Sequence, residues 1–190
     1  LARLLPPFVT PVLLFVNENA QTIAQACALL PNALVQLHGD ESPAFANSLK
    51  RPYIKAARLP LDAAQDFDLP QFCLGFASAQ GILLDAKVDG FGGSGLAFDW
   101  GRIPSPFPQH LLLSAGLKPE TVGAAVARFA AIAPSFGVDV SSGVEDIRGD
   151  FECFVIRLGR EGHDHEVLDV DAALRVLASA EDLNLRQRQQ

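Results

Sequence analysis

Methionine is absent from this chain of 190 residues, tryptophan and tyrosine occur once each, and there are only three cysteines. Cys27, Cys73 and Cys153 lie far apart and form no CxxC pair, a pattern typical of a reducing compartment that offers no zinc framework. We therefore expect a cytoplasmic protein without a metal site. Because the chain also begins inside an apolar pattern, the missing methionine indicates a fragment of a longer protein.

Long hydrophobic runs and an excess of positive charge are missing too. Prolines interrupt the apolar stretch at residues 1–16, so no run approaches the roughly 20 residues that span a bilayer. The net charge is −7, the pI is about 5.0 and the basic residues are scattered. These features argue against a membrane-spanning protein and against nucleic acid as a main partner.

Hydrophobic residues, by contrast, make up 49% of the chain, enough for one domain with a sizeable core. They gather in short apolar runs of strand length, and six strands are predicted, at residues 12–16, 34–38, 53–57, 82–85, 110–114 and 136–140. Helical patterns lie between them, from a cap at Asn17 or Asn19, from Ser42 and Pro43, around residues 71–77, and over residues 119–131. This alternation predicts repeated βα units and a parallel sheet.

Periodicity alone does not choose between an open doubly wound sheet and a closed barrel. His38, Asp85, Ser114 and Ser141 end four different predicted strands, and a (β/α)8 barrel spreads its site around a ring in this way. We therefore expect an α/β fold of the TIM-barrel type, incomplete, with about six βα units. Residues 1–150 would form this partial barrel. Residues 151–190 would form an atypical segment with a strand at 151–158, a helix at 171–180 and a polar tail.

Asp85 closes the apolar run at residues 81–88, and a glycine-dense loop follows that run. Asp85 would either cap this loop or pair with Lys87, or it would act as a general acid, because desolvation favours the protonated form of a carboxyl group. The loop ends in aromatic anchors at residues 98–100, which favours a ligand cover over a mobile linker. Its candidate residues are Gly92, Gly93, Ser94 and Gly95.

Two small-residue turns follow the last two predicted strands, at residues 114–117 and 139–143. Backbone N–H groups in such turns can hold a phosphate, although ordinary βα turns use glycine and serine just as often. His38 is either a pocket residue or a polar contact on the helix side. His163 and His165 lack a third ligand at suitable spacing, which favours a solvated loop over a metal site.

Taken in order, these motifs resemble phosphoribosylanthranilate isomerase, a (β/α)8-barrel enzyme of tryptophan biosynthesis. The resemblance covers about residues 6–145 and rests on residues 35–41, 83–85, 92–95, 98–100, 114–120 and 137–145. It implies an Amadori rearrangement of N-(5-phosphoribosyl)anthranilate without a cofactor, with a phosphorylated small molecule as the only ligand. It also implies that Asp85 is the general acid. The substrate-binding residues would be His38, Gly116, Asp139, Ser141, Ser142 and Gly143.

The chain departs from the family pattern at several points. The cysteine base expected after the first strand of the family is missing, since none of the three cysteines has that context, and an arginine after the second strand is missing as well. Ala115 replaces a usual glycine, and a Gly-x-Lys-Asp segment expected after Glu145 is not found. We therefore expect impaired catalysis. A barrel without its first two units would also expose open sheet edges and self-associate through them.

Two rival functions stay open from the sequence. Another phosphate-binding barrel enzyme, such as a relative of indole-glycerol-phosphate synthase, would need a lysine at a strand end, and Lys55 is the candidate. A non-catalytic barrel remnant would instead bind phosphorylated ligands or a partner chain.

Overall fold

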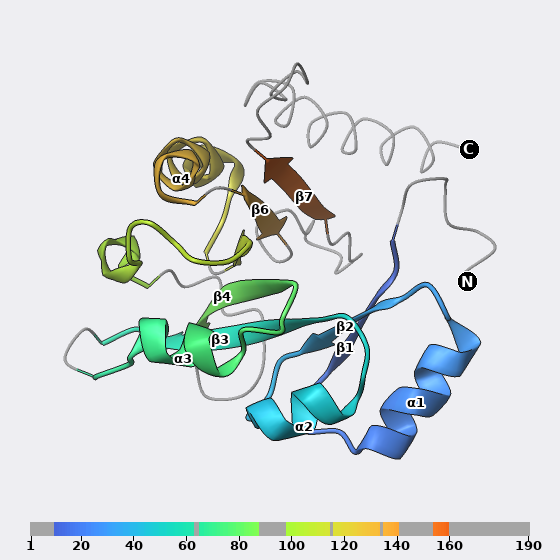
Figure 1. Cartoon of the computed structure of the whole chain (residues 1–190). Coiled ribbons are helices and arrows are strands. Elements are labelled where there is room, and N and C mark those ends of the chain that lie inside the picture. Colours follow the sequence, from blue (N-terminus) through green and yellow to red (C-terminus); the bar gives the residue numbers. More distant parts are fainter. Residues whose placement is uncertain are drawn as a thin grey trace, which may run out of the picture.

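A sheet of seven strands, hydrogen-bonded in chain order from β1 to β7, organises the computed structural model of this chain (Figure 1). The structure describes residues 10–62, 65–87, 98–114, 116–133, 135–140 and 154–159. A doubly wound sheet reverses its strand order at a switch point, whereas here each strand pairs with its neighbour in sequence. The order is that of a barrel wall, as the strand-end residues predict.

The first six strands are parallel, and their bounds are β1 (Val12–Phe15), β2 (Leu34–Leu37), β3 (Tyr53–Pro60), β4 (Gly81–Lys87), β5 (Leu111–Leu113) and β6 (Ser135–Val140). All six predicted strands are confirmed, and β3 is longer than expected because its pairing with β4 continues as far as Pro60. The strand expected at residues 151–158 is β7 (Phe154–Gly159), which pairs antiparallel with β6.

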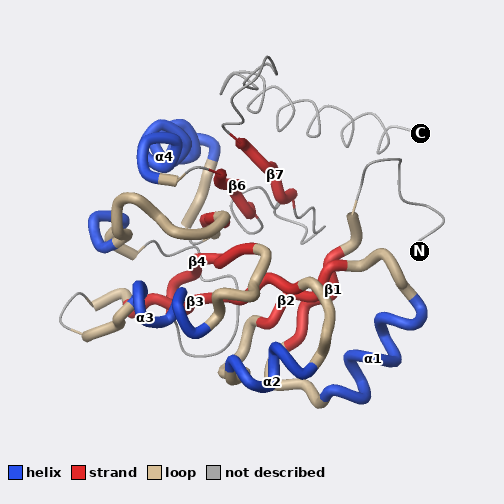
Figure 2. Tube along the Cα trace, in the orientation of Figure 1, coloured by secondary structure: helices blue, strands red, loops and turns tan. Residues whose placement is uncertain are grey.

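In the described ranges, four α-helices cover the outer side of the curved sheet, namely α1 (Ala20–Leu29), α2 (Pro43–Ser48), α3 (Leu69–Gly75) and α4 (Pro119–Ile132) (Figure 2). A short 3-10 helix, η2 (Trp100–Arg102), precedes β5. Asn19 caps α1 and Ser42 caps α2, each accepting a hydrogen bond from a backbone N–H three residues on. Asn17 is not a cap. Its φ is 53°, and its side chain instead accepts the Asp40 N–H.

The two faces of the sheet carry different residues because side chains alternate along each strand. The outer face is apolar and packs under the helices, with Val35, Leu37, Ile82, Leu84, Leu111, Leu113 and Val138 buried there. The inner face begins with a small apolar layer of Leu34, Ile54, Ala56, Leu83 and Leu112. Beyond this layer, toward the carboxyl ends of the strands, the inner positions become polar. The candidate site therefore lies at these polar positions of the inner face.

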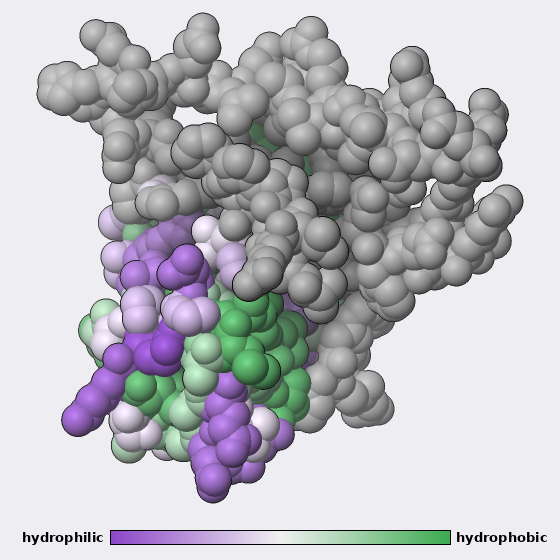
Figure 3. All heavy atoms as spheres, turned by 90° about the vertical axis from the view of Figure 1, so that its right-hand side faces the viewer, coloured by the Kyte–Doolittle hydropathy of each residue, from purple (hydrophilic) through white to green (hydrophobic). Residues whose placement is uncertain are grey.

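β1 forms one edge of the sheet, since among the described residues it pairs with β2 alone. Val12 is 40% exposed and Leu14 55% exposed, so this strand carries apolar side chains that the described residues leave uncovered. Figure 3 shows the molecule from the side of α1, with an apolar area next to strongly polar residues. The described residues thus leave an apolar edge on this side of the sheet.

The boundary proposed at residue 150, the helix at 171–180 and the polar tail lie outside the described residues. No helix in the described ranges is long and apolar enough to cross a membrane.

Candidate active site

His38 and Asp85 meet on the inner face of the sheet. His38 directly follows β2, Asp85 lies in β4, and His38 Nε2 is 3.1 Å from Asp85 Oδ2. Both side chains are largely buried, with 8% and 14% of their surfaces exposed. The structure therefore places His38 toward the barrel interior, not on the helix side.

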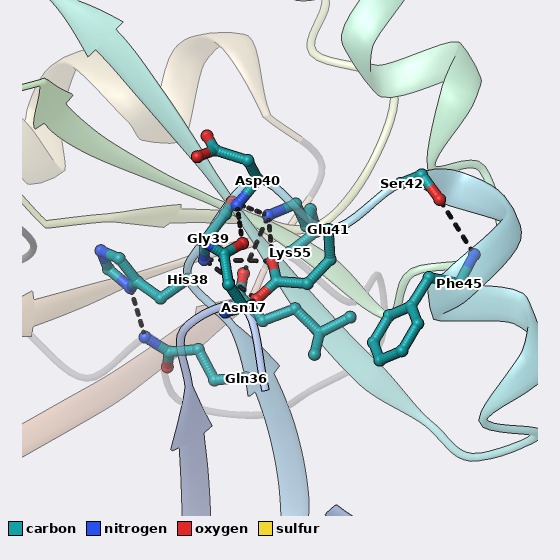
Figure 4. A network of polar contacts seen from close by, with 10 residues as sticks. Asn17, Gln36, His38, Gly39, Asp40, Glu41, Ser42, Phe45 and Lys55 are labelled. Atoms are coloured by element: carbon teal, nitrogen blue, oxygen red, sulfur yellow. Dashed lines mark hydrogen bonds and ion pairs between the residues drawn. The ribbon is translucent and has the colours of Figure 1, made fainter. Parts of the chain in front are cut away.

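Gln36 extends this contact into a chain of three side chains. It lies two residues before His38 on the same face of β2, and its Nε2 is 3.0 Å from His38 Nδ1 (Figure 4). With the amide NH2 group on this side, Nδ1 is the acceptor of this contact, and a neutral ring then carries its proton on Nε2, the atom that faces Asp85.

Each oxygen of the Asp85 side chain makes one polar contact. Oδ2 lies 3.1 Å from His38 Nε2, and Oδ1 accepts the backbone N–H of Ala86 at 2.8 Å. Arg58 lies opposite Asp85 in the β3–β4 register, on the same face and half-buried. This part of the inner face therefore combines an acid, a histidine in contact with it, and a neighbouring cation.

The opposite part of the inner face is formed by β5, β6 and the residues that follow them. Gly116, just after β5, has a φ of 69°, a left-handed conformation that glycine adopts without strain. Asp139 is half-buried on β6, two residues after Gly137, which pairs with inner-face Leu112. The other predicted site residues, Gly92, Gly93, Ser94, Gly95, Ser141, Ser142 and Gly143, lie outside the described residues.

Behind the site, on the helix side of the sheet, lies a buried ion pair that the sequence did not reveal. Lys55 Nζ is 2.9 Å from Glu41 Oε2, and each side chain is 2% exposed (Figure 4). The ammonium also donates to the carbonyls of Leu37 and Gly39, and the Glu41 carboxylate accepts the N–H groups of Gly39 and Asn17. These bonds tie the residues that follow β1 and β2 to the side chain of Lys55 in β3.

Burial acts against both charges of this pair. Burial tends to raise the pKa of the Glu41 carboxyl, but hydrogen bonds from Lys55 and from the Asn17 N–H outweigh it and hold that pKa below its ordinary value. Burial lowers the pKa of the Lys55 ammonium, and the hydrogen bond with Glu41 opposes that change. We regard the two groups as a charged pair, because three hydrogen bonds from the ammonium would weaken if it lost its proton.

Lys55 consequently does not face the barrel interior. Its register partner in β4 is Ile82, a residue of the outer core, and its ammonium lies 5.6 Å from the centre of the Phe76 ring. A synthase-type chemistry that uses a strand-end lysine would need this ammonium on the other face. The structure therefore removes the only lysine that the sequence offered for that rival function.

The described cysteines also lie away from the inner face. Cys27 in α1 and Cys73 in α3 are free thiols buried in the outer core, and burial raises the pKa of Cys73 to about 11. Cys153, His163 and His165 lie outside the described residues. Within the described ranges, no group of three His, Cys, Asp or Glu side chains is placed to hold a metal ion.

Gln36, Arg58 and Glu41 were not predicted as site residues, and Lys55 was considered only for the rival synthase-type function. The spacing of Gln36 from His38 gives a usable signal, since residues two apart share a face of a strand. Arg58 would have been found if the third strand had been extended beyond Ala57. Nothing local indicates the partner of Lys55, because Glu41 lies in a turn 14 residues away.

Parallel strands in barrel order, with a histidine–aspartate pair where they end, define an α/β-barrel enzyme. The family model of N-(5'phosphoribosyl)anthranilate (PRA) isomerase matches residues 6–153. The N-(5'-phosphoribosyl)anthranilate isomerase of Leptothrix cholodnii is 46% identical over 174 residues, 91% of this chain and 76% of the relative. That of Methylibium petroleiphilum is 46% identical over 157 residues, 83% of this chain and 70% of the relative. The chain belongs to the phosphoribosylanthranilate isomerase family.

Solved structures agree with this assignment. The phosphoribosyl anthranilate isomerase of Thermotoga maritima has a TM-score of 0.61 at 36% identity, covering 78% of this chain and 69% of that one. A phosphoribosyl anthranilate isomerase in complex with reduced 1-(o-carboxyphenylamino)-1-deoxyribulose 5-phosphate has a TM-score of 0.59 at 32% identity, covering 80% and 69%. The resemblance inferred from the sequence motifs is therefore confirmed, and so is the barrel fold.

Proposed function

We propose that this chain converts N-(5'-phosphoribosyl)anthranilate to 1-(2-carboxyphenylamino)-1-deoxyribulose 5-phosphate, an Amadori rearrangement of tryptophan biosynthesis. The family and its named relatives support this reaction, and the ligand of one solved relative is a reduced form of the proposed product. The observation that carries the proposal is the contact between His38 and Asp85 on the inner face. It puts an acid and a proton donor where barrel enzymes bind their substrates.

Asp85 is the general acid in this proposal. It gives a proton to the ring oxygen of the ribose as the bond from that oxygen to C1′ breaks, and the nitrogen lone pair forms the C=N bond of a Schiff base. A base then removes the proton from C2′, and the electron pair left behind gives an enolamine. The enolamine tautomerises to the ketone. A well-placed acid contributes roughly 10²–10⁴ to such a rate.

The phosphate would be held at the ends of β5 and β6. The left-handed turn at Gly116 precedes α4, and small residues at such turns leave backbone N–H groups available to an anion. Ser141, Ser142 and Gly143 would complete this grip, and His38 and Asp139 would line the pocket between the phosphate and the anthranilate. The reaction needs no cofactor in this scheme.

Neither described cysteine is the base of this reaction in our proposal. Cys27 and Cys73 lie in helices on the outer side of the sheet, and the Cys73 thiol, with its pKa raised to about 11, carries very little thiolate at neutral pH. Since the described residues contribute the acid without a cysteine base, we expect slower turnover than in a relative that has this base.

The test is a steady-state assay of product formation by the wild-type chain, Asp85→Asn and Asp66→Asn. Asp66 is exposed and serves as the matched control. We expect Asp85→Asn to lose roughly 100-fold or more in kcat and Asp66→Asn to behave as wild type. Full activity of Asp85→Asn would refute the role of this acid. A wild-type chain that neither turns over nor binds the reduced product would support a non-catalytic remnant.

A further inference from the structure

Gln36 is a buried polar residue for which the proposed mechanism gives no role. Only 7% of the residue is exposed, and its register neighbours are Leu14 on β1 and Ile54 on β3. Neither aliphatic side chain offers a hydrogen bond to the amide. Within the described part of the chain, the polar contact of this amide is with His38 Nδ1, at 3.0 Å.

The donor and acceptor groups of the three side chains determine which atoms carry protons in this contact. With the amide NH2 toward His38, Nδ1 accepts, Nε2 carries the ring proton, and Asp85 Oδ2 accepts from it. Asp85 is then without a proton. An aspartic acid ready to donate needs the reverse arrangement, in which Oδ2 carries a proton and donates to Nε2.

The reverse arrangement requires an acceptor at Gln36. When Nε2 accepts from Asp85, neutral His38 keeps its own proton on Nδ1, and an NH2 group facing that proton would oppose two donors. Turning the amide by about 180° brings its oxygen to the same place and removes the conflict. This second arrangement holds two protons in the His38–Asp85 pair, whereas the first holds one.

We propose that Gln36 is a positioning residue for the acid step, and that the orientation of its amide selects whether Asp85 carries the proton. With its oxygen toward His38 it stabilises the two-proton form, from which Asp85 can donate to the substrate. With its NH2 group toward His38 it stabilises the one-proton form, which arises when Nδ1 loses its proton to solvent and the Asp85 proton moves to Nε2. Glutamine suits this position because both ends of its amide form hydrogen bonds of similar length. The inference rests on the acid role proposed for Asp85.

Other charges face the pair and must be held constant in any test. On the inner face these are Arg58 on β3, Lys87 at the end of β4 and Asp139 on β6, and on the opposite face the Lys55–Glu41 pair. Variants of Gln36 leave all of these residues in place. Differences in activity between such variants therefore depend on which group faces His38 Nδ1.

The experiment compares Gln36→Glu, which presents only acceptors when ionised, with Gln36→Leu, which presents no partner. Activity requires the form with two protons, so kcat/KM falls on the alkaline side. We expect Gln36→Glu to move this alkaline limb to higher pH by about one unit or more. Gln36→Leu should lower kcat roughly tenfold with little change in KM. Gln71→Glu, an exposed change in α3, is the control.

Imidazole ¹⁵N spectra give a readout that does not depend on turnover, with His38→Asn used to assign the signal. We expect His38 of Gln36→Glu to keep its Nδ1 proton to higher pH than in the wild type. An unchanged Nδ1 titration and an unmoved alkaline limb in folded Gln36→Glu would overturn the inference. If the titration moves but the wild-type chain forms no product, the hold of Gln36 on His38 stands and the proposed function fails.

Discussion

The Lys55–Glu41 pair gives the sharpest prediction about stability, through the substitution Lys55→Met. Methionine keeps an unbranched apolar stem close in length to that of lysine but removes the ammonium. The ammonium donates to Leu37 O at 3.2 Å, Gly39 O at 2.6 Å and Glu41 Oε2 at 2.9 Å. After the change, the Glu41 carboxylate stays buried with only the backbone N–H groups of Asn17 and Gly39 as donors.

The size of the effect follows from what is left unpaired. Removing one partner of a buried ion pair costs about 3–5 kcal/mol, because the remaining charge has no counter-ion. A whole domain is stable by only about 5–15 kcal/mol, so Lys55→Met should be near the limit of folding. Neutralising the second partner relieves this, so the double variant Lys55→Met/Glu41→Gln should be more stable than the sum of the single changes, by about 0.5–3 kcal/mol.

Urea unfolding followed by fluorescence measures these differences. Trp100 is the only tryptophan, and it packs edge-on against Phe129 with ring centroids 5.7 Å apart. Exposed Lys50→Met is the matched control and should change the unfolding free energy by less than about 0.5 kcal/mol. A Lys55→Met variant as stable as this control would refute the reasoning, and so would strict additivity in the double variant.

Two further predictions concern the same network. Because the pKa of Glu41 is lowered on folding from its usual 4.5, the unfolded chain binds more protons just below that pH, so stability is lost as pH falls through the folded value. Acid titration of unfolding stability should show a shallower loss in Glu41→Gln, and an unchanged slope would contradict this. Gly39→Ala would push a Cβ into the Asn17 side chain and should cost about 1–3 kcal/mol. Gly75→Ala, whose Cβ meets Pro43 at an ordinary 3.5 Å, should be tolerated, and equal melting temperatures of these two variants would count against the clash.

The strands were predictable because each is a short apolar run closed by a polar or turn residue, and no competing helical pattern overlaps it. The barrel order was predictable from polar residues at several strand ends. Strand length was less predictable. β3 continues to Pro60 through Arg58, a charged residue that ends an apolar pattern in sequence but lies on the polar part of the inner face in the fold.

It was harder to predict which face of the sheet each side chain occupies. Alternation says that Lys55 and Ala56 lie on opposite faces of β3, but it does not say which face is the inner one. Lysine at a strand end therefore suggested catalysis, and the structure instead buries it under the helices with Glu41. Similarly, the sequence did not decide whether His38 lies in the pocket or on the helix side of the sheet. Its place became clear only when β2 and β4, two strands apart in the sheet, brought it against Asp85.

The two polar networks lie on opposite faces of the same strand end, and this explains why a costly buried pair is retained. His38 and Gly39 are consecutive residues. His38 faces inward to Asp85. Gly39 is held on the other side through its N–H by Glu41 and through its carbonyl by Lys55 (Figure 4). A buried ion pair adds little net stability compared with apolar packing, but it fixes geometry through several directed bonds. We infer that Lys55 and Glu41 hold the backbone from which His38 reaches Asp85, so an apolar replacement of both could restore stability without restoring the alignment of the histidine.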